Sequence, residues 1–184
     1  MALTKTPICE FNKKAEHFQL KSTENKIVSL NDIKGKNGTL IMFICNHCPY
    51  VKAVIGDIVD DTKKLKKEGI NSVAIMSNDT SNYPEDSFDN MIKFAKENNF
   101  NFPYLIDEKQ EIAKIYDAVC TPDFFGYNKN LELQYRGRIR ELKNLKPVKT
   151  SESDLLNAMR LIAKTKNGPK EQIPSMGCSI KWFK

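Results

Sequence analysis

TLIMFICNHCPY, residues 39–50, is the stretch that decides the fold. Apart from its opening Thr, its first six residues are apolar, which predicts a buried strand. Cys45 and Cys48 follow at the start of an amphipathic helix. Backbone N–H groups and the positive end of the helix dipole at such a position favour thiolate over thiol. The stretch therefore predicts a reactive pair, in which Cys45 is an accessible, partly ionised nucleophile and Cys48 is close enough to form a disulfide with it.

Strands and helices alternate after this pair. From Pro49 onward, apolar residues recur at helical spacing as far as Gly69, which predicts a helix that begins with proline in its first turn. Further strands are predicted at 70–76 and 104–106, and further helices at 88–98 and 112–116. Such alternation implies parallel strands joined by right-handed crossovers.

Hairpins and a tail are predicted outside this central part. Turn-rich segments predict an N-terminal hairpin from 17–20 and 26–29 and a late hairpin from 124–127 and 131–137. Ser151, with Asp154 three residues later, resembles a capping box before a last helix. The tail, residues 168–184, is too apolar to remain in solvent, so we expect it to pack onto the domain with Trp182 and Phe183 as core anchors. One domain, 1–184, accommodates all of these elements.

The composition indicates a globular protein without a membrane or nucleic-acid partner. No apolar run approaches membrane-spanning length, and the first residues lack the apolar core of a secretory signal, so we expect a cytoplasmic location. The net charge of +6 comes mostly from scattered lysines, not from basic residues clustered with aromatic ones. Arg136, Arg138 and Arg140 alternate as they would on one face of a strand. We interpret them as a solvated edge, with binding of an acidic partner or an anionic thiol as the alternative.

The order of elements resembles the thioredoxin-fold superfamily, and more closely its AhpC/TSA-related, peroxiredoxin-like branch of thiol-disulfide isomerase and thioredoxin family proteins. The segments that carry the resemblance are FICNHCPYVKAV, SNDTSNYPEDSF, CTPDFF, YRGRI and PSMGCSIKW. The resemblance implies an α/β, thioredoxin-like fold, with a central mixed sheet flanked by helices, the N-terminal hairpin and a packed C-terminal tail. It also implies that Cys45 attacks, that Cys48 resolves the mixed disulfide, and that Thr121-Pro122 is a cis peptide facing the pair.

The predicted activity is thiol-disulfide exchange. Its substrate would be a disulfide-containing protein or a small thiol, another thiol system would donate electrons, and no cofactor is required. We expect the Thr121-Pro122 backbone to pair with an extended substrate. Asn46 and His47 would tune the pair, because an imidazole near Cys45 stabilises its thiolate and makes the disulfide more oxidising than that of thioredoxin, at about −270 mV.

The other cysteines of this odd set of five are Cys9, Cys120 and Cys178. Cys178 lies in a tail segment that carries the resemblance, and Cys120 precedes Thr121, so both are considered as additional redox residues. A packed thiol is the simpler interpretation of each. Cys9 receives no role.

Two other functions use the same residues. In peroxiredoxins a Thr stands three residues before the peroxidatic cysteine, but here that position is Cys45 or Met42, depending on which cysteine reacts. Neither supplies a hydroxyl, so fast peroxide reduction, and with it an antioxidant role, is kept only as an alternative. Zn²⁺ would need Cys45, His47 and Cys48 with Cys120 or Cys178. A single CxxC is a weak zinc signal and a closed site would occupy the nucleophile, so we expect no metal.

Overall fold

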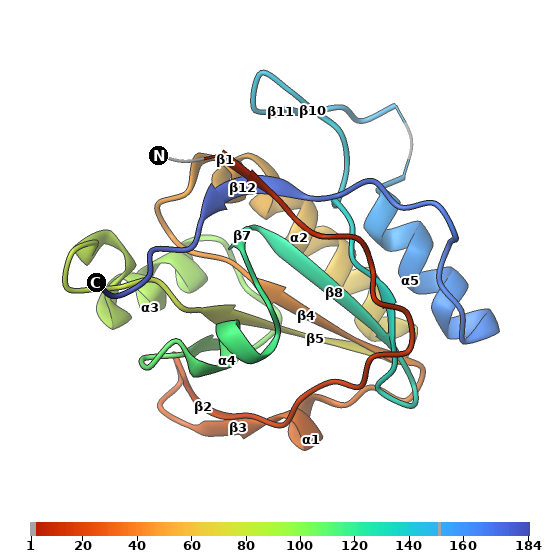
Figure 1. Ribbon diagram of the computed structural model, residues 1–184, viewed down its shortest axis with the longest axis horizontal. Coiled ribbons are helices and arrows are strands. Elements are labelled where there is room, and N and C mark those ends of the chain that lie inside the picture. Colours follow the sequence, from red (N-terminus) through yellow and green to blue (C-terminus); the bar gives the residue numbers. More distant parts are fainter. Residues whose placement is uncertain (1–2, 151) are drawn as a thin grey trace.

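The computed structural model describes residues 3–150 and 152–184, and within these ranges seven strands form the central sheet, in the order β3-β2-β6-β5-β4-β8-β9 (Figure 1). The strands are β2 (Gln19–Ser22), β3 (Ile27–Ser29), β4 (Gly38–Phe43), β5 (Ile70–Met76), β6 (Tyr104–Ile106), β8 (Asp123–Asn128) and β9 (Leu133–Tyr135). Strands β4, β5 and β6 run parallel, whereas β2 with β3 and β8 with β9 form the two predicted hairpins. The sheet is therefore mixed, as predicted.

Helices cover both faces of this sheet. They are α1 (Leu30–Ile33), α2 (Pro49–Lys67), α3 (Phe88–Glu97), α4 (Glu111–Ile115) and α5 (Asp154–Thr165). Side chains alternate along β4, so Leu40 and Met42 join the core under α2, α3 and α5, while Ile41 and Phe43 join the core beside α1 and α4. This double burial explains why the strand sequence is apolar throughout rather than alternating.

Local signals set the ends of α2 and α5. Pro49 occupies the first turn of α2, and Gly69 takes a positive φ of 77° just after the helix. The side chain of Ser153 accepts a hydrogen bond from the Leu156 N–H and caps α5. The prediction that Ser151 provides this cap is wrong, because the helix begins two residues later than that cap requires; Ser151 itself lies outside the described residues.

The tail packs back on the domain as a strand. Within the described chain, β12 (Met176–Ser179) lies between β1 (Leu3–Lys5) and β7 (Cys120–Thr121) in a second sheet of three strands (Figure 1). Trp182 and Phe183 are 39% and 49% exposed, so the prediction that they anchor the tail in the core is wrong. After β12, Ile180 is the apolar residue that is buried. The backbone pairing of β12 with β1 and β7 also attaches the tail to the domain.

The arginines do not form a solvated stripe. Strand β9 ends at Tyr135, and the Arg136 side chain is buried at 3% exposure, where its Nη2 lies 3.0 Å from Asp123 Oδ2. Its guanidinium also lies over the Phe125 ring, 4.5 Å from the centroid. Arg138 pairs with Asp154 near the start of α5. The predicted single face of three exposed arginines is therefore wrong, because a buried carboxylate holds the first of them inside the fold.

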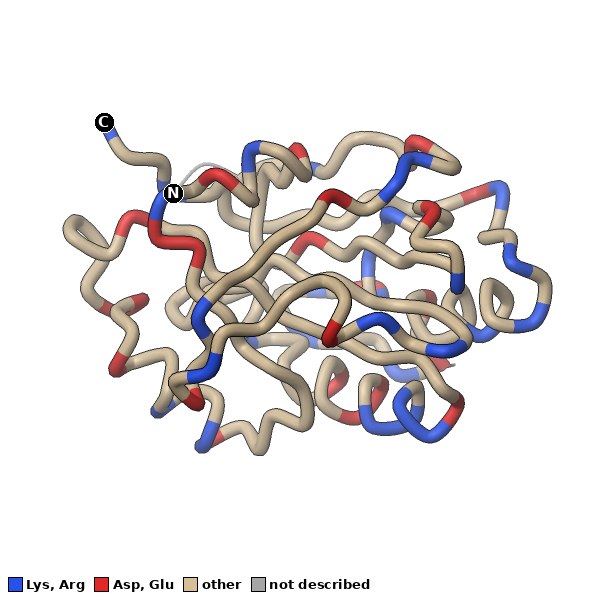
Figure 2. The backbone as a smooth tube through the Cα atoms, turned by 90° about the horizontal axis from the view of Figure 1, so that it is seen from below, with Lys and Arg blue, Asp and Glu red and all other residues tan. Residues whose placement is uncertain are grey.

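The charges are spread over the molecule. Figure 2 shows basic and acidic residues interspersed along the chain. The remaining short elements are the strands β10 (Leu142–Lys143) and β11 (Lys146–Pro147) and the 3-10 turn η1 (Pro84–Asp86). Among the described helices, none has both the length and the apolar character needed to cross a bilayer.

Candidate active site

The candidate active site lies where β4 ends and α2 begins. Cys45 lies two residues beyond the end of β4, and Cys48 is the N-cap residue of α2. Three other segments meet the two cysteines here: η1 with Asp86, β7 with Thr121, and β12 with Cys178. The fold thus gathers residues from four parts of the chain around one helix start, beyond the carboxyl ends of the parallel strands.

Cys45 is buried against polar neighbours. Its Sγ lies 3.3 Å from Thr121 Oγ1 and 4.0 Å from His47 Nδ1, and the residue is 1% exposed. The expectation of an accessible Cys45 is therefore wrong for this state of the protein. A substrate can reach the sulfur only if a neighbouring side chain moves.

Cys48 contacts a third cysteine and a backbone carbonyl oxygen. Its Sγ lies 3.0 Å from Cys178 Sγ and 3.1 Å from the Thr121 carbonyl oxygen. The Cys45 thiol, and to a smaller extent the Cys178 thiol and the Val51 N–H, lower the pKa of Cys48 to about 5, although burial opposes them. The hydrogen bond to Cys48, burial and the Asp86 carboxylate together raise the pKa of Cys45 well above its usual range.

The pKa values of the two cysteines are therefore shifted in opposite directions in the reduced protein. The Thr121 carbonyl oxygen favours a Cys48 thiol, because it can only accept a hydrogen bond. Cys48 lies at the positive end of α2, which favours its thiolate. The opposite directions of the two pKa shifts also favour the thiolate on Cys48, contrary to the expectation that Cys45 is the ionised member of the pair.

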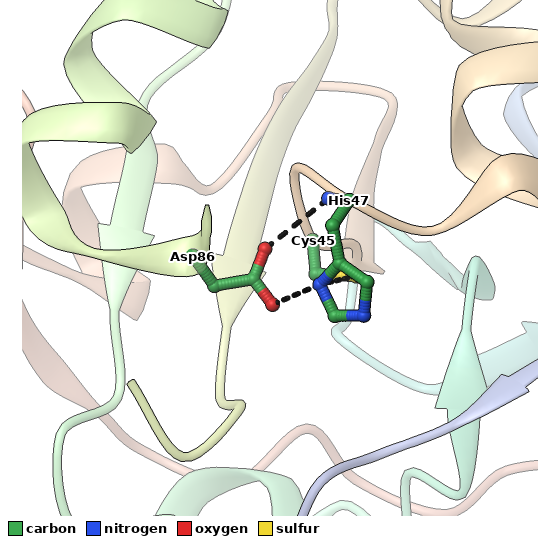
Figure 3. Close-up of side chains that lie close together, drawn as sticks. All are labelled: Cys45, His47 and Asp86. Atoms are coloured by element: carbon green, nitrogen blue, oxygen red, sulfur yellow. Dashed lines mark hydrogen bonds and ion pairs between the residues drawn. The ribbon is translucent and has the colours of Figure 1, made fainter. Parts of the chain in front are cut away.

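His47 and Asp86 form an ion pair beside the cysteines (Figure 3). His47 Nδ1 lies 2.7 Å from Asp86 Oδ2, and the hydrogen bond raises the pKa of His47. Asp86 is fully buried, which acts to raise its pKa, but hydrogen bonds from His47 and Asn78 outweigh burial and lower it. Asp86 Oδ1 also accepts the backbone N–H groups of Asn46 and His47. Asp86 thus fixes the loop between the two cysteines.

This pair changes the predicted role of His47. The same nitrogen, Nδ1, faces both Cys45 Sγ and Asp86, so the ring cannot bond to Asp86 through one nitrogen and take the Cys45 proton through the other in this geometry. The carboxylate also offsets the positive charge of an imidazolium. Asp86 was not predicted from the sequence; the only signal is its place in SNDTSNYPEDSF, one of the segments that carry the resemblance.

Asn46 supports the loop rather than contacting a sulfur. Its side-chain amide donates to the Glu85 carbonyl oxygen at 3.1 Å, and its Oδ1 accepts the Tyr104 hydroxyl at 2.9 Å. Both ends of the side chain are thus engaged in structural hydrogen bonds. Any effect of Asn46 on the cysteines passes through the position of the loop.

The Thr121-Pro122 peptide is cis, as the resemblance implies. Its backbone edge is not open to a substrate strand, however, because Thr121 lies opposite Cys178 in the antiparallel pair of β7 and β12. The Pro122 carbonyl oxygen accepts the Ser175 hydroxyl at 2.7 Å. The tail of the chain therefore occupies the edge on which we expected an extended substrate. Cys120 is buried beside this segment, and its Sγ lies 3.7 Å from the Pro122 carbonyl oxygen, as a packed thiol would.

A cavity of about 270 Å³ borders this segment. Pro122 and Tyr50 line it on the side of the candidate site, and Ile139 and Met176 add apolar surface. Basic side chains also contribute to its walls, namely Lys5, Arg138 and Arg140. A substrate segment with apolar and acidic groups would match this lining.

The predicted zinc set is not assembled. In the parts of the chain that the structure describes, the side chains that could share a metal are Cys45, His47 and Asp86, whose ligand atoms lie within 4.8 Å of one another. Cys48 and Cys178 instead contact each other. The alternative zinc site, in which Cys45, His47 and Cys48 combine with Cys120 or Cys178, is therefore wrong, because these side chains do not converge on one point.

Comparisons with known proteins place the chain in a family. The family model described as AhpC/TSA matches residues 11–142. The thiol-disulfide oxidoreductase ResA of Bacillus thuringiensis subsp. konkukian is 28% identical over 128 residues, which are 69% of either chain. ResA of Bacillus subtilis (strain 168) is 28% identical over 114 residues, 62% of this chain and 59% of that relative.

Solved structures confirm the predicted thioredoxin-like fold. A conserved protein from Geobacillus kaustophilus is 40% identical and superimposes with a TM-score of 0.94, over 100% of this chain and 97% of that one. A thioredoxin family thiol:disulfide interchange protein from Chlorobium tepidum TLS is 16% identical with a TM-score of 0.64, over 83% and 97% of the two chains. The second likeness concerns the fold alone.

Proposed function

Because this chain belongs to the AhpC/TSA family, we propose that it is a thiol-disulfide oxidoreductase whose redox pair is Cys45 and Cys48. The observation that carries the proposal is the placement of these two cysteines at the start of α2, where both sulfurs contact Thr121 of the cis peptide. A Cys-X-X-Cys pair at a helix start, with one thiol pKa lowered, is typical of a reactive pair rather than of packed thiols. The ResA relatives, which are named for this activity, support the same reaction.

The first step makes Cys45 the nucleophile. The Cys48 thiolate, which lies at the same helix start, takes the proton of the Cys45 thiol. The Cys45 thiolate then attacks one sulfur of a substrate disulfide, whose S–S bond breaks as the Cys45–substrate bond forms. The leaving substrate thiolate takes the proton from Cys48. Thr121 Oγ1, 3.3 Å from Cys45 Sγ, can donate a hydrogen bond to the attacking thiolate.

The second step releases the substrate. The Cys48 thiolate attacks Cys45 Sγ, the mixed disulfide breaks, and the second substrate thiolate leaves and takes a proton from water. Two electrons have then passed from the two cysteines to the substrate, and the enzyme holds the Cys45–Cys48 disulfide. Reduction by a thiol donor restores the starting state, and the reverse sequence oxidises a dithiol substrate.

Substrate access requires a movement near His47. The His47 side chain is partly exposed and contacts Cys45, and its ring stacks on Tyr83 at an interplanar angle of 8°. We propose that a substrate displaces this ring and binds through the neighbouring cavity at Pro122. Its basic lining favours an acidic protein segment or an anionic thiol such as glutathione.

Trapping of the mixed disulfide tests this function. We expect Cys48→Ser to abolish reduction of insulin and of oxidised glutathione and to accumulate adducts on Cys45, detected by mass spectrometry. Cys45→Ser should form no such adduct. Cys120→Ala, which removes another buried cysteine, should react like the wild type. If Cys48→Ser yields no Cys45 adduct with either disulfide while it remains folded, the exchange mechanism is wrong.

The finer properties remain proposals with their own tests. A cytoplasmic location would be checked by cell fractionation, and a potential less reducing than that of thioredoxin by equilibration with glutathione. The antioxidant alternative would be checked by stopped-flow reaction with hydrogen peroxide, for which we expect slow oxidation.

A further inference from the structure

Cys178 lies close to the redox pair because of the register of the tail strand. In the antiparallel pair of β7 and β12, Cys178 stands directly opposite Thr121. Directly opposed residues project to the same face of a sheet, and Thr121 Oγ1 contacts Cys45 on that face. Cys178 Sγ accordingly lies 3.0 Å from Cys48 Sγ. Cys48 and Cys178 thus form a second close pair of sulfurs, and Thr121 contacts both Cys45 and Cys48.

The tail strand is held firmly in this register. A Cβ atom on Gly177 would lie 2.0 Å from the Thr121 carbonyl oxygen, so only glycine permits this close approach. On the other side, Ser175 donates its backbone N–H to Thr6 Oγ1 and accepts the Thr6 N–H. The place of Cys178 therefore follows from backbone packing on both edges of β12.

We propose that Cys178 is a third redox residue, which exchanges with the Cys45–Cys48 disulfide to form a Cys48–Cys178 disulfide and to return Cys45 to the thiol state. This inference rests on the proposed function, because it starts from the oxidised pair. It assigns the tail strand a chemical role at the edge where a substrate strand was expected.

The exchange needs no external oxidant. Cys178 loses its proton and attacks Cys48 Sγ, the Cys48–Cys178 bond forms, and the Cys45–Cys48 bond breaks. The Cys45 thiolate leaves with the bond electrons and takes the proton that Cys178 gave up. One disulfide is replaced by another, so the number of electrons in the enzyme is unchanged. Burial raises the pKa of Cys178 to about 12, so the proton transfer to Cys45 must accompany the attack.

The consequence is an oxidised enzyme with a reactive Cys45. In a two-cysteine enzyme, oxidation removes both thiols from reaction. Here the Cys48–Cys178 form stores the disulfide away from His47 and leaves the Cys45 sulfur able to engage a further substrate or donor. Cys48 is then the shared member of two alternative disulfides.

Disulfide mapping after oxidation tests the inference. Cys45→Ser, with Cys45→Ala as a second variant in case the first does not fold, is oxidised with diamide, blocked with N-ethylmaleimide and digested without reduction. We expect a peptide pair joined through Cys48 and Cys178, and its loss on further substitution of Cys178 by Ser. Cys120→Ala in the Cys45→Ser background is the matched control and should keep the pair. If Cys48 and Cys178 are both fully alkylated in the folded variants, the inference is overturned.

A second measurement separates this inference from the proposed function. In oxidised wild type that is unfolded in the presence of N-ethylmaleimide, so that the buried Cys45 is accessible, we expect part of Cys45 to be labelled. We expect this labelling to be lost in Cys178→Ser, which still forms the Cys45–Cys48 disulfide. Equal labelling in the two proteins would overturn the third redox role while leaving the exchange function intact. Failure of the wild type to form a Cys45–Cys48 disulfide or to reduce insulin would overturn the function, and with it the exchange that starts from that disulfide.

Discussion

Replacement of Asp86 by Asn removes the buried charge that organises the active-site loop. The carboxylate accepts hydrogen bonds from the backbone N–H groups of Asn46 and His47, from the Asn78 amide and from the His47 ring. An asparagine side chain has one acceptor oxygen in place of two. We therefore expect Asp86→Asn to affect both the stability of the fold and the ionisation of the cysteines.

The loss of stability arises at Oδ2, which accepts from both Asn78 and the His47 ring. If the new oxygen keeps the backbone bonds, the new NH₂ group faces the Asn78 amide nitrogen, which lies 2.8 Å from Asp86 Oδ2. Asn78 cannot turn its amide round without loss, because its Oδ1 accepts the Lys181 N–H at 2.9 Å. A buried donor without an acceptor costs about 1–3 kcal/mol, so we expect the free energy of unfolding to fall by that amount. Denaturant unfolding at pH 5.5, a value between the usual pKa values of the two groups, measures it.

The pH dependence has a defined sign. Because the pair raises the pKa of His47 above 6.5, its stabilisation is fully present below pH 6.5 and is lost as the pH rises through the folded-state value. Because the pKa of Asp86 is lowered from 3.8, the same stabilisation is present above pH 3.8 and is lost as the pH falls through the lowered value. The difference between wild type and Asp86→Asn should therefore be largest from pH 3.8 to 6.5 and should shrink above this range.

The cysteines provide a second readout. The hydrogen bond to Cys48 and burial raise the pKa of Cys45, and the Asp86 carboxylate adds to them, so Asp86→Asn removes the third of these causes. The pH profile of alkylation by iodoacetamide should move to lower pH. Glu85→Gln removes the same formal charge from an exposed neighbour and should change stability by less than about 0.5 kcal/mol. A profile that moves to higher pH, or equal stability of wild type and Asp86→Asn at pH 5.5, would refute this account of the loop.

Three other substitutions test the surroundings of the site. Arg136→Gln leaves Asp123 buried without its partner and should cost about 3–5 kcal/mol in unfolding at pH 7, with a smaller loss at pH 5, because burial raises the pKa of Asp123 to about 6. Gly177→Ala places a Cβ against the Thr121 carbonyl, so thermal unfolding should show a loss of about 1–3 kcal/mol and mapping should show no Cys48–Cys178 disulfide. Ser153→Ala removes the cap of α5 and should cost about 1 kcal/mol in denaturant unfolding.

The central strands could be predicted because their signals are local. β5 and β6 have the predicted bounds, since a short apolar run buried on both faces looks the same in sequence and in structure. Pro49 likewise marked the start of α2 through its own backbone geometry. The placement of Cys45 after a strand and of Cys48 at a helix start could therefore be predicted from β4 and α2 alone.

Partners distant in sequence could not be predicted in this way. The alternation of Arg136 with Arg138 and Arg140 fits a solvated edge as well as it fits the observed structure. The buried position of Arg136 is determined by its ion pair with Asp123, a buried carboxylate on β8. No periodic pattern in the sequence links these two residues. Asp86 is a similar case, because its loop shows no pattern and its four hydrogen bonds appear only when η1 meets the loop after β4.

The position of Cys178 illustrates why register matters more than residue type here. Cys120 and Cys178 are both buried cysteines on neighbouring strands, and the sequence offers no reason to prefer one. Side chains alternate along a strand, so Cys120 projects away from the face on which its neighbour Thr121 contacts Cys45. A shift of β12 by one residue would place Gly177 or Ser179 opposite Thr121 and turn Cys178 away from Cys48. The third sulfur therefore depends on a pairing that Gly177 allows and that residues on β1 help to fix, and disulfide mapping of Cys45→Ser measures that pairing directly.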